Sequence, residues 1–324
     1  MSPSIVELLN EMAVLPAKRD GSVDLISSSD LQVDDSLPHL GAGAFAVCVS
    51  AMKDGTTPCV VKIQRNLDYD QFDRELKAML KCNGHKDSRI VQLRAVCMPP
   101  PETTSVPRLV MPLVSGMILG KWLHATGSNT KYSVLCIAHQ LVDAVRHLHD
   151  VVGIVHGDLS MKNVMVDGAK NRLVLIDLGN SRSTAKGKLR LWVHGNYSLS
   201  PPEALCGHDC DLALAEVHVV GVLLICIDLG RTNGLCECPL PFKDGEDRDD
   251  KCAVARLVRF WGRAKLFPYW SELLEKAGEG IERIAGNASG NVTDRIGRVG
   301  LKLADPIPSS RQSLSEALRH LKLT

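Results

Sequence analysis

The chain has 324 residues, of which 45% are hydrophobic, so it can bury one large core or two modest ones and has the composition of a folded globular protein. Its 38 Lys and Arg residues nearly balance 37 Asp and Glu residues, and this net charge of +1 gives no global field to favour nucleic acid or an anionic membrane as partner. The eleven cysteines form no regular framework, and Glu7 and Glu11 interrupt the place of a secretion signal, so we expect free thiols and an intracellular chain, cytoplasmic or nuclear.

Residues 1–36 begin with a short amphipathic piece and continue into a polar stretch, Ser27 to Ser36, which is low in core-forming residues. We expect these residues to form an N-terminal extension ahead of a domain that spans residues 37–324.

Two glycines, Gly41 and Gly43, lie among apolar and β-branched residues, and this pattern predicts a hairpin whose turn lets backbone N–H groups approach an anion. A plain hairpin is the alternative. Lys62 follows the apolar run that begins at Cys59, so it favours phosphate binding over the role of a solvated edge lysine. The candidate nucleotide-binding turn comprises Leu40, Gly41, Ala42, Gly43, Ala44, Phe45, Ala46, Val47 and Cys48.

The next elements complete a small antiparallel sheet with one helix. Phe72, Leu76 and Met79 recur at helical spacing, with Glu75 beside them. Residues 90–96 and 109–111 read as strands on either side of a proline-rich loop, and residues 112–116 then resemble a connection between two lobes.

A long helix with one buried face is predicted next, because apolar residues recur at steps of three and four from Val134 to Leu148. It leads to Asp158, which is followed five residues later by Asn163 and, beyond a predicted hairpin over residues 164–176, by Asp177. A carboxylate can accept a proton from a hydroxyl group, and Asn163 and Asp177 offer the hard oxygen ligands that Mg²⁺ prefers.

Further along, the apolar run Val217 to Leu229 is too short to span a membrane and predicts a buried helix. Two cysteine groups, Cys206/His208/Cys210 and Cys236/Cys238, lack the paired spacing of structural zinc sites, so zinc is a minor alternative to incidental cysteines. Ser313 and Glu316 form a capping box that opens a final helix.

The stretch His156 to Asn163 and the triplet Asp177 to Gly179 resemble the catalytic loop and metal-binding triplet of the eukaryotic-type protein kinase superfamily. Pro201-Pro202-Glu203 is similar to the end of that family's activation segment. The resemblance implies an α+β, bilobal fold with ATP in the cleft, a small β-rich lobe over residues 37–114 and a larger, mainly helical lobe over residues 115–324.

The same resemblance implies a role for each candidate residue. Asp158 would be the catalytic base, Lys162 would stabilise the transferring phosphoryl group, and Asn163 and Asp177 would bind Mg²⁺. Lys62 would contact the ATP phosphates. The remaining implied roles fall to Glu75 as the partner of Lys62, with Asp70 and Asp73 as alternatives, to Met111 and Val114 beside the adenine, and to Arg311 as the ion-pair partner of Glu203.

Several positions depart from the family pattern. Ala46 replaces the third glycine of the turn, Ser160 replaces a lysine, and Asn196 replaces a threonine of the activation segment. Gly157 replaces the arginine that would clamp a phosphorylated activation segment, so activity need not depend on such phosphorylation. Drift of this kind suggests a fast-evolving member, and a large DNA virus is a candidate source.

We therefore expect an ATP-dependent kinase that phosphorylates protein Ser or Thr hydroxyls, because the charged residues that the chemistry needs are all present. The alternatives are a pseudokinase that serves as a binding or scaffolding module and, less favoured, a small-molecule kinase. The sequence predicts neither the substrate nor the oligomeric state, nor a role for residues 231–251.

Overall fold

The computed structural model describes residues 23–33, 40–42, 46–65, 69–85, 87–99, 106–125, 130–186, 188–189, 199–205, 209–230, 271–272, 274–279, 281 and 294–322. The chain divides into two compact units. Unit 1 comprises Met1–Ser115 with Ile176–Ser181, and unit 2 comprises Gly116–Leu175 with Arg182–Thr324. Each is described on its own.

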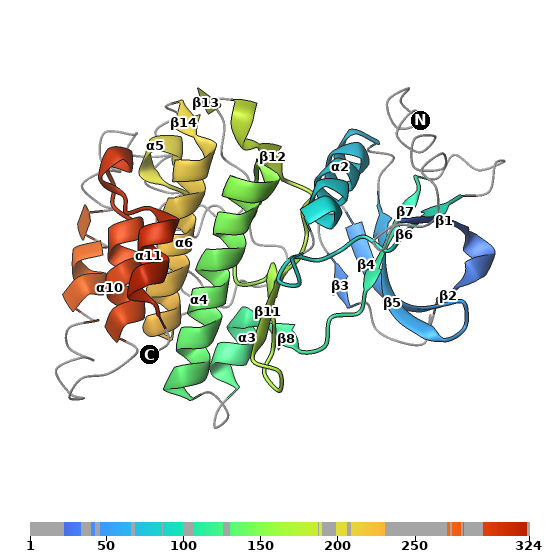
Figure 1. Ribbon diagram of the computed structural model, residues 1–324, viewed down its shortest axis with the longest axis horizontal. Coiled ribbons are helices and arrows are strands. Elements are labelled where there is room, and N and C mark those ends of the chain that lie inside the picture. The colour runs from blue at the N-terminus through green and yellow to red at the C-terminus, as the bar shows by residue number, and fades with distance from the viewer. Residues whose placement is uncertain are drawn as a thin grey trace, which may run out of the picture. The chain divides into compact units, whose positions relative to one another are not determined.

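Unit 1 is built on one curled sheet of seven strands in the order β1-β6-β7-β5-β4-β2, with β3 paired to β4 (Figure 1). All neighbours are antiparallel except β1 and β6. The strands are β1 (Asp24–Ser27), β2 (Leu31–Val33), β3 (Gly41–Ala42), β4 (Ala46–Lys53), β5 (Thr57–Gln64), β6 (Ala95–Met98) and β7 (Arg108–Pro112).

Strands β4 and β5 form the central hairpin of this sheet. Its tight turn contains Asp54 and Gly55, both with positive φ (53° and 68°), the conformation that suits the twist of a hairpin. The register sets Cys48 opposite Lys62 and Gly41 opposite Cys48, so the predicted hairpin with its lysine strand is confirmed.

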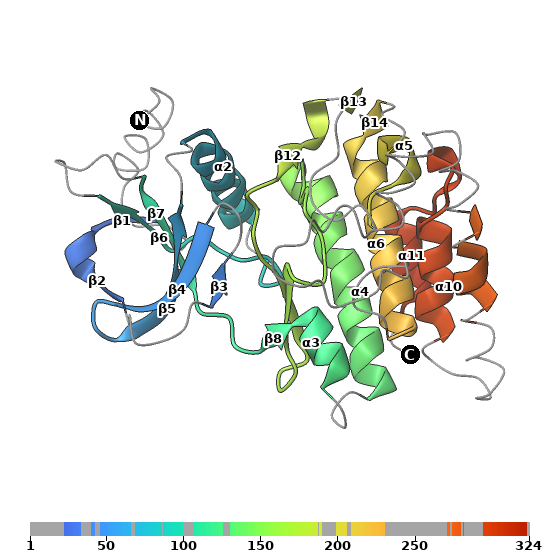
Figure 2. The same ribbon diagram turned by 180° about the vertical axis from the view of Figure 1, so that it is seen from behind.

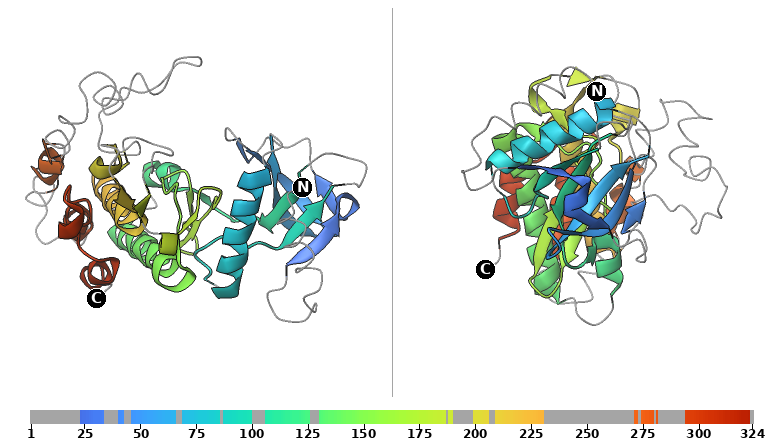
Figure 3. Two further views of the ribbon diagram at one scale, coloured as in Figure 1. Left: turned by 90° about the horizontal axis from the view of Figure 1, so that it is seen from above. Right: turned by 90° about the vertical axis from the view of Figure 1, so that its right-hand side faces the viewer.

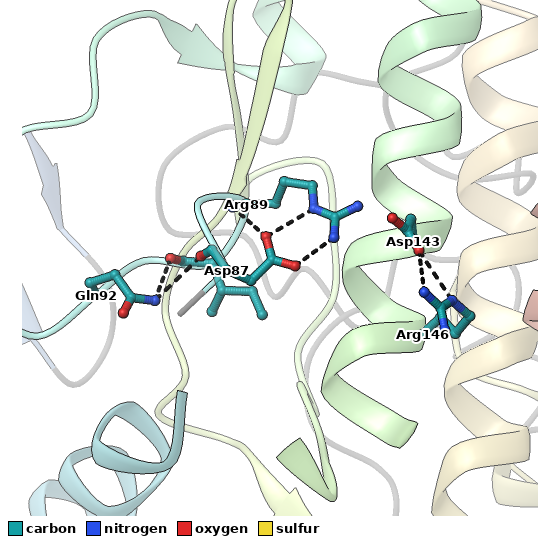
Figure 4. A network of polar contacts seen from close by, with 6 residues as sticks. Asp87, Arg89, Gln92, Asp143 and Arg146 are labelled. Atoms are coloured by element: carbon teal, nitrogen blue, oxygen red, sulfur yellow. Dashed lines mark hydrogen bonds and ion pairs between the residues drawn. The ribbon is translucent and has the colours of Figure 1, made fainter. Parts of the chain in front are cut away.

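Helix α2 (Tyr69–His85) runs alongside the strands of the sheet (Figure 3). It buries the predicted stripe completely, since Phe72, Leu76 and Met79 have no exposed surface. After the helix, Arg89 donates to Asp87 through Nε (2.9 Å) and Nη2 (2.5 Å), and Gln92 donates to the carbonyl oxygen of Ile90 at 3.0 Å (Figure 4). These bonds fix the loop that returns the chain to the sheet.

Residues 24–33 differ from the expectation of an extension ahead of the fold, because they form β1, a 3₁₀ turn (Ser28–Asp30) and β2 of this sheet. The composition of the stretch misleads, since its polar residues occupy the turn while Ile26, Leu31 and Val33 pack against the sheet core. A boundary at residue 36 therefore does not separate this segment from the sheet.

Unit 2 is mainly helical, and helices α4, α6, α10 and α11 form its body (Figure 2). Among the described residues, its helices include α3 (Leu119–His124), α4 (Lys131–His147), α5 (Pro202–Leu205), α6 (Leu212–Asp228), α10 (Asp294–Leu303) and α11 (Leu314–His320), and residues 274–279 are helical as well. Its short strands are β8 (Met117–Ile118), β9 (Ile154–Val155), β10 (Val164–Asp167), β11 (Arg172–Leu175), β12 (Arg182–Ser183), β13 (Lys188–Leu189) and β14 (Cys210–Asp211).

Helix α4 has the predicted buried face, with Ile137, Leu141 and Val145 fully buried. On its surface, Arg146 donates to Asp143 one turn earlier at 2.7 Å (Figure 4). A π-helical turn (Leu148–Val152) ends the helix, and Gly153 leaves it with φ 74°, a conformation that suits glycine.

Helix α6 is the buried helix that the apolar run predicts. It packs very closely on α10, because a Cβ on Gly221 would lie 2.6 Å from the carbonyl oxygen of Gly300 and 2.5 Å from the backbone nitrogen of Ala304. The two backbones meet where both helices lack a side chain, which fixes their spacing.

Candidate active site

The first group of site residues lies in unit 1 and centres on Lys62. Its Nζ donates to Glu75 Oε1 and to Asp177 Oδ1, each at 2.7 Å. The lysine side chain is 9% exposed and that of Glu75 is 1% exposed, whereas that of Asp177 is 44% exposed. The expected pairing of Lys62 with Glu75 is confirmed, and Asp73 instead pairs with Lys77 on the surface.

This arrangement keeps Lys62 charged. Burial alone would lower the pKa of its ammonium group, but the carboxylates of Glu75 and Asp177 outweigh that effect and raise the pKa above its ordinary value. The same surroundings act on Cys48, whose thiol pKa is raised to about 11 by burial and by both carboxylates, while Lys62 partly opposes the rise. Cys48 is therefore a neutral thiol at physiological pH.

Asp177 occupies an unusual backbone conformation, with φ 65° in a residue other than glycine. Its Oδ1 also accepts the backbone N–H of Gly179 at 3.3 Å, which closes a tight turn. A Cβ on Gly179 would lie 3.3 Å from that oxygen and 3.4 Å from Glu75 Oε2, so glycine leaves the space that these carboxylates occupy. The strained backbone conformation therefore occurs at Asp177, whose carboxylate is partly open to solvent.

Part of the candidate nucleotide-binding turn lies within the described residues. Leu40 is exposed and donates its backbone N–H to the carbonyl oxygen of Cys48 at 2.9 Å, Gly41 is exposed, and Ala46 is buried. Ala42 pairs with Val47 across strands β3 and β4. Gly43, Ala44 and Phe45 lie outside the described residues.

The two residues expected beside an adenine ring also belong to unit 1. Met111 is buried on β7, opposite Val60 of β5, and Val114 is half-buried just after that strand. Apart from Asp177, the described candidate residues of unit 1 therefore lie on the sheet, on its connecting segments or on α2.

The second group lies in unit 2, on the loop between β9 and β10. Asn163 Nδ2 donates to the carbonyl oxygen of Asp158 at 2.7 Å and to its Oδ2 at 3.1 Å, which fixes the two side chains against each other. The amide oxygen of Asn163 then lies on the other branch of the side chain, and it is a hard ligand of the kind that Mg²⁺ takes. The donor set of Asn163 and Asp177 thus fits a magnesium ion, and their expected convergence on one ion stays a prediction.

Alternate residues of this loop point inward. Leu159 and Met161 are buried, at 4% and 5% exposed, while Lys162 is exposed and Ser160 is half-buried. The buried pair holds the loop on the helical body, so Lys162 is the cation that the loop presents to solvent.

Helix α6 holds the start of the same loop through Glu216. This fully buried carboxylate accepts the backbone N–H groups of His156 and Gly157, each at 2.9 Å, and contacts His149 Nε2 at 2.8 Å. Burial alone would raise the pKa of Glu216, but the hydrogen bond from His149, the electrostatic influence of His149 and His156, and the backbone N–H of Gly157 together lower it. Gly157 has φ 82°, which glycine adopts without strain.

The predicted ion pair of Glu203 with Arg311 is confirmed. Arg311 Nη1 and Nη2 donate to Glu203 Oε1 and Oε2 at 2.6 and 2.7 Å, and Arg311 also donates to the carbonyl oxygens of Leu214 and Asp305. Burial and the Arg311 charge lower the pKa of the neighbouring His218 well below its usual range, so that side chain is neutral. Arg311, in the loop before α11, thus ties α5 to α6 and to Asp305.

The structure bears on two other kinds of site within the described residues. Among the described residues, no group of three or more His, Cys, Asp and Glu side chains could hold a metal ion. Cys206, His208, Cys236 and Cys238 lie outside the described residues. Of the helices that the structure describes, none is long and apolar enough to cross a membrane.

Comparison with known proteins identifies the family, because the model of the protein kinase domain matches residues 35–285, well over half of the chain. This chain belongs to the protein kinase family. Among its relatives, serine/threonine-protein kinase SRK2I of Arabidopsis thaliana is 24% identical over 241 residues, which are 74% of this chain and 63% of that protein. Serine/threonine-protein kinase SAPK3 of Oryza sativa subsp. indica is 24% identical over 69% of this chain and 64% of its own length.

Similarity extends to other kingdoms. Death-associated protein kinase dapk-1 of Caenorhabditis elegans is 27% identical over 260 residues, which are 74% of this chain and 17% of that protein. This chain therefore corresponds to less than two thirds of the length of the plant relatives and to a small part of the nematode protein. Membership of the kinase family accounts for the α+β fold of two units.

Sequence reasoning missed His149, which lies 67 positions before Glu216 and contacts its carboxylate. A signal was present, because Glu216 stands in a mostly apolar helix and a buried carboxylate requires partners. The identity of those partners depends on tertiary packing, which the local pattern does not encode.

Proposed function

We propose that this kinase transfers the γ-phosphate of ATP to Ser or Thr hydroxyl groups of a protein substrate, with Asp158 as the catalytic base. The observation that carries the proposal is the buried ion pair of Lys62 with Glu75, with Asp177 as a second partner of the lysine, each at 2.7 Å. Burying a lysine and a glutamate costs free energy unless they are paired, so a chain under no demand for phosphate binding has little reason to keep this pair.

In the proposed reaction, Asp158 orients the substrate hydroxyl and accepts its proton as the oxygen bonds to the γ-phosphorus. The bond from that phosphorus to the bridging oxygen breaks, and ADP leaves with the bond electrons. Asn163 positions Asp158 through the two hydrogen bonds from its amide nitrogen. Lys162, exposed on the same loop, supplies positive charge for the transferring phosphoryl group.

Binding of the nucleotide falls to the other candidates. Lys62 contacts the phosphates, the turn from Leu40 to Cys48 covers them, and Met111 and Val114 contact the adenine. A bound Mg²⁺ ion neutralises phosphate charge, and Asn163 and Asp177 are the residues that would hold it. The names of the plant relatives support Ser and Thr as acceptors.

The alternative is a pseudokinase that serves as a binding module. The replacement of the third turn glycine by Ala46, which is buried at the start of β4, favours it because a side chain there reduces the freedom of the turn.

A single comparison separates the two. The full chain is given Mg·ATP and a mixed set of Ser, Thr and Tyr peptides, while nucleotide binding is measured by calorimetry. Phosphoserine or phosphothreonine as product supports the kinase, and tight nucleotide binding without transfer to any peptide supports the pseudokinase.

A further inference from the structure

Residues 24–33 connect the two margins of the sheet that carries Lys62. Strand β1 pairs with β6 in parallel, from Asp24 beside Ala95 to Ser27 beside Met98. Only the three-residue turn from Ser28 to Asp30 separates it from β2, which pairs antiparallel with β4 at the opposite end of the strand order. Figure 1 shows this blue segment passing from β1 to β2 around the curled sheet. We call residues 24–33 the clip.

The clip is held at each of its elements. Asp24 of β1 accepts a hydrogen bond from Lys53 Nζ of β4 at 2.5 Å. This bond links two strands that are not neighbours in the sheet. The carbonyl oxygen of Asp30 accepts the backbone N–H of Asp54, in the β4–β5 turn, at 3.0 Å. The side chain of Ser27 and that of Asp30 form a reciprocal capping box on the intervening turn. The short turn is therefore specified by its own sequence.

The clip also contributes to the core of the sheet. Leu31, 8% exposed, belongs to a buried cluster, and Ile26 and Val33 are partly buried residues packed against that cluster. The other buried members come from the four strands β4, β5, β6 and β7, namely Ala51, Cys59, Val61, Ala95, Cys97 and Val110.

This core lies directly behind the lysine of the site. Side chains alternate along a strand, so Cys59, Val61 and Ile63 of β5 face the clip core while Lys62 points to the opposite face. On that opposite face Lys62 meets Glu75 of α2. The position of Lys62 is thus set by contacts on both faces of one strand.

We propose that the clip is a positioning element of the kinase, in which Leu31 packs behind β5 and thereby holds Lys62 in place for the nucleotide phosphates. Its effect on β5 is independent of catalysis, whereas its effect on nucleotide use rests on the function proposed above. Leu31 touches neither substrate nor nucleotide in this account.

The test compares Leu31→Ser with Leu25→Ser, a matched control in the same clip whose side chain is 37% exposed. Backbone hydrogen exchange in residues 57–64 is expected to rise about tenfold in Leu31→Ser and to stay at the wild-type rate in Leu25→Ser. In Leu31→Ser the KM for ATP is expected to rise about fivefold, while kcat stays within about twofold of wild type. Leu31→Met should restore the wild-type exchange rate and the wild-type KM. Equal exchange in the two serine variants would overturn the proposal.

A second variant keeps the test decisive if Leu31→Ser does not fold. The register sets Ile26 beside Cys97, so Ile26→Cys places two thiols on adjacent strands at a spacing that suits a disulfide. Oxidation is expected to slow exchange in residues 57–64, reductant should reverse the effect, and Ile26→Cys with Cys97→Ser should not respond. No slowing in the cross-linked protein would overturn the proposal.

These readings are distinguishable from failure of the proposed function. A wild-type chain that transfers no phosphate contradicts the kinase function, while the exchange rates of β5 still decide whether the clip holds that strand. Altered KM for ATP without altered exchange in β5 would contradict the clip and leave the kinase function intact.

Discussion

Glu216 accepts a hydrogen bond from the backbone N–H of Gly157 at 2.9 Å, so a carboxylate on a buried helix holds the residue that precedes Asp158. The two residues are 59 positions apart in the chain. Because the carboxylate is fully buried, each of its hydrogen bonds forms in a low dielectric, where it stabilises the loop strongly. The loop that carries Asp158 is thus positioned from the core of unit 2.

Replacement of this carboxylate is expected to destabilise the protein. Glu216→Gln places an amide NH₂ group among donors, so we expect a loss of about 2–4 kcal/mol in the free energy of unfolding, measured by urea denaturation. The matched control is Glu272→Gln, because Glu272 is exposed and pairs with Lys276 on the surface, and it should change stability by less than about 0.5 kcal/mol. Equal stability of the two variants would show that the buried hydrogen bonds contribute nothing.

The same group gives a pH dependence. The pKa of Glu216 is lower in the folded chain than in the unfolded chain, so its ionised form stabilises the fold above the ordinary carboxyl pKa. That contribution is lost as the pH falls through the lower, folded-state pKa. Wild type should therefore lose stability on acidification more steeply than Glu216→Gln, when unfolding is followed by circular dichroism from pH 7 downward.

The pair of Lys62 and Glu75 should be strongly coupled. Lys62→Met removes the positive charge beside the buried carboxylate of Glu75, and Glu75→Gln removes one of the two carboxylates that face the buried lysine. The two single losses in stability should therefore add up to more than the loss in the double variant. A double-mutant cycle on stability is expected to give a coupling energy of about 1–3 kcal/mol. Strictly additive losses would mean that the 2.7 Å contact has no energetic weight.

Nucleotide binding provides a separate readout for the same lysine. Because Glu75 and Asp177 keep Lys62 charged, Lys62→Met should weaken ATP binding by about tenfold or more, as measured by calorimetry. Lys77→Met is a matched control, since Lys77 lies on the surface of α2 and pairs with Asp73. Weakening of the same size in both variants would contradict a phosphate contact by Lys62.

The close approach of α6 and α10 makes a prediction for glycine. Gly300→Ala should destabilise the chain by about 2–4 kcal/mol, because the added Cβ would lie 2.8 Å from the carbonyl oxygen of Gly221. Gly278→Ala is the control. Gly278 lies among the helical residues 274–279, where alanine favours helix by up to about 1 kcal/mol. Among the described residues, its Cβ would meet a Leu301 side-chain atom at 3.6 Å, an ordinary contact. In thermal unfolding, the Tm of Gly300→Ala should lie below that of wild type and the Tm of Gly278→Ala should lie above it.

The site could be predicted from sequence to the extent that its residues lie in short motifs. Lys62 with Glu75 and Glu203 with Arg311 were expected as pairs and are paired, because each member stands in a recognisable local pattern. The buried stripe of α2 and the buried helix α6 also follow from periodicity and apolar content.

What the sequence did not predict depends on long-range packing. The parallel pairing of β1 with β6 joins residues about 70 positions apart, and a four-residue strand with one partly buried side chain has no local signature. His149 was missed for the same reason, since nothing near it in sequence indicates a contact with α6. Apart from the boundary at residue 36, the division into domains remains a prediction, as do the shared metal site and the roles of individual site residues.

The central claim is that Asp158 is the base of a phosphoryl-transfer reaction, and a comparison of wild type with Asp158→Asn at saturating Mg·ATP tests it most directly. The account predicts that the variant transfers phosphate to its Ser or Thr substrate about 10²–10⁴-fold more slowly, while calorimetry gives the same ATP affinity within about twofold. Transfer by Asp158→Asn at the wild-type rate would contradict it.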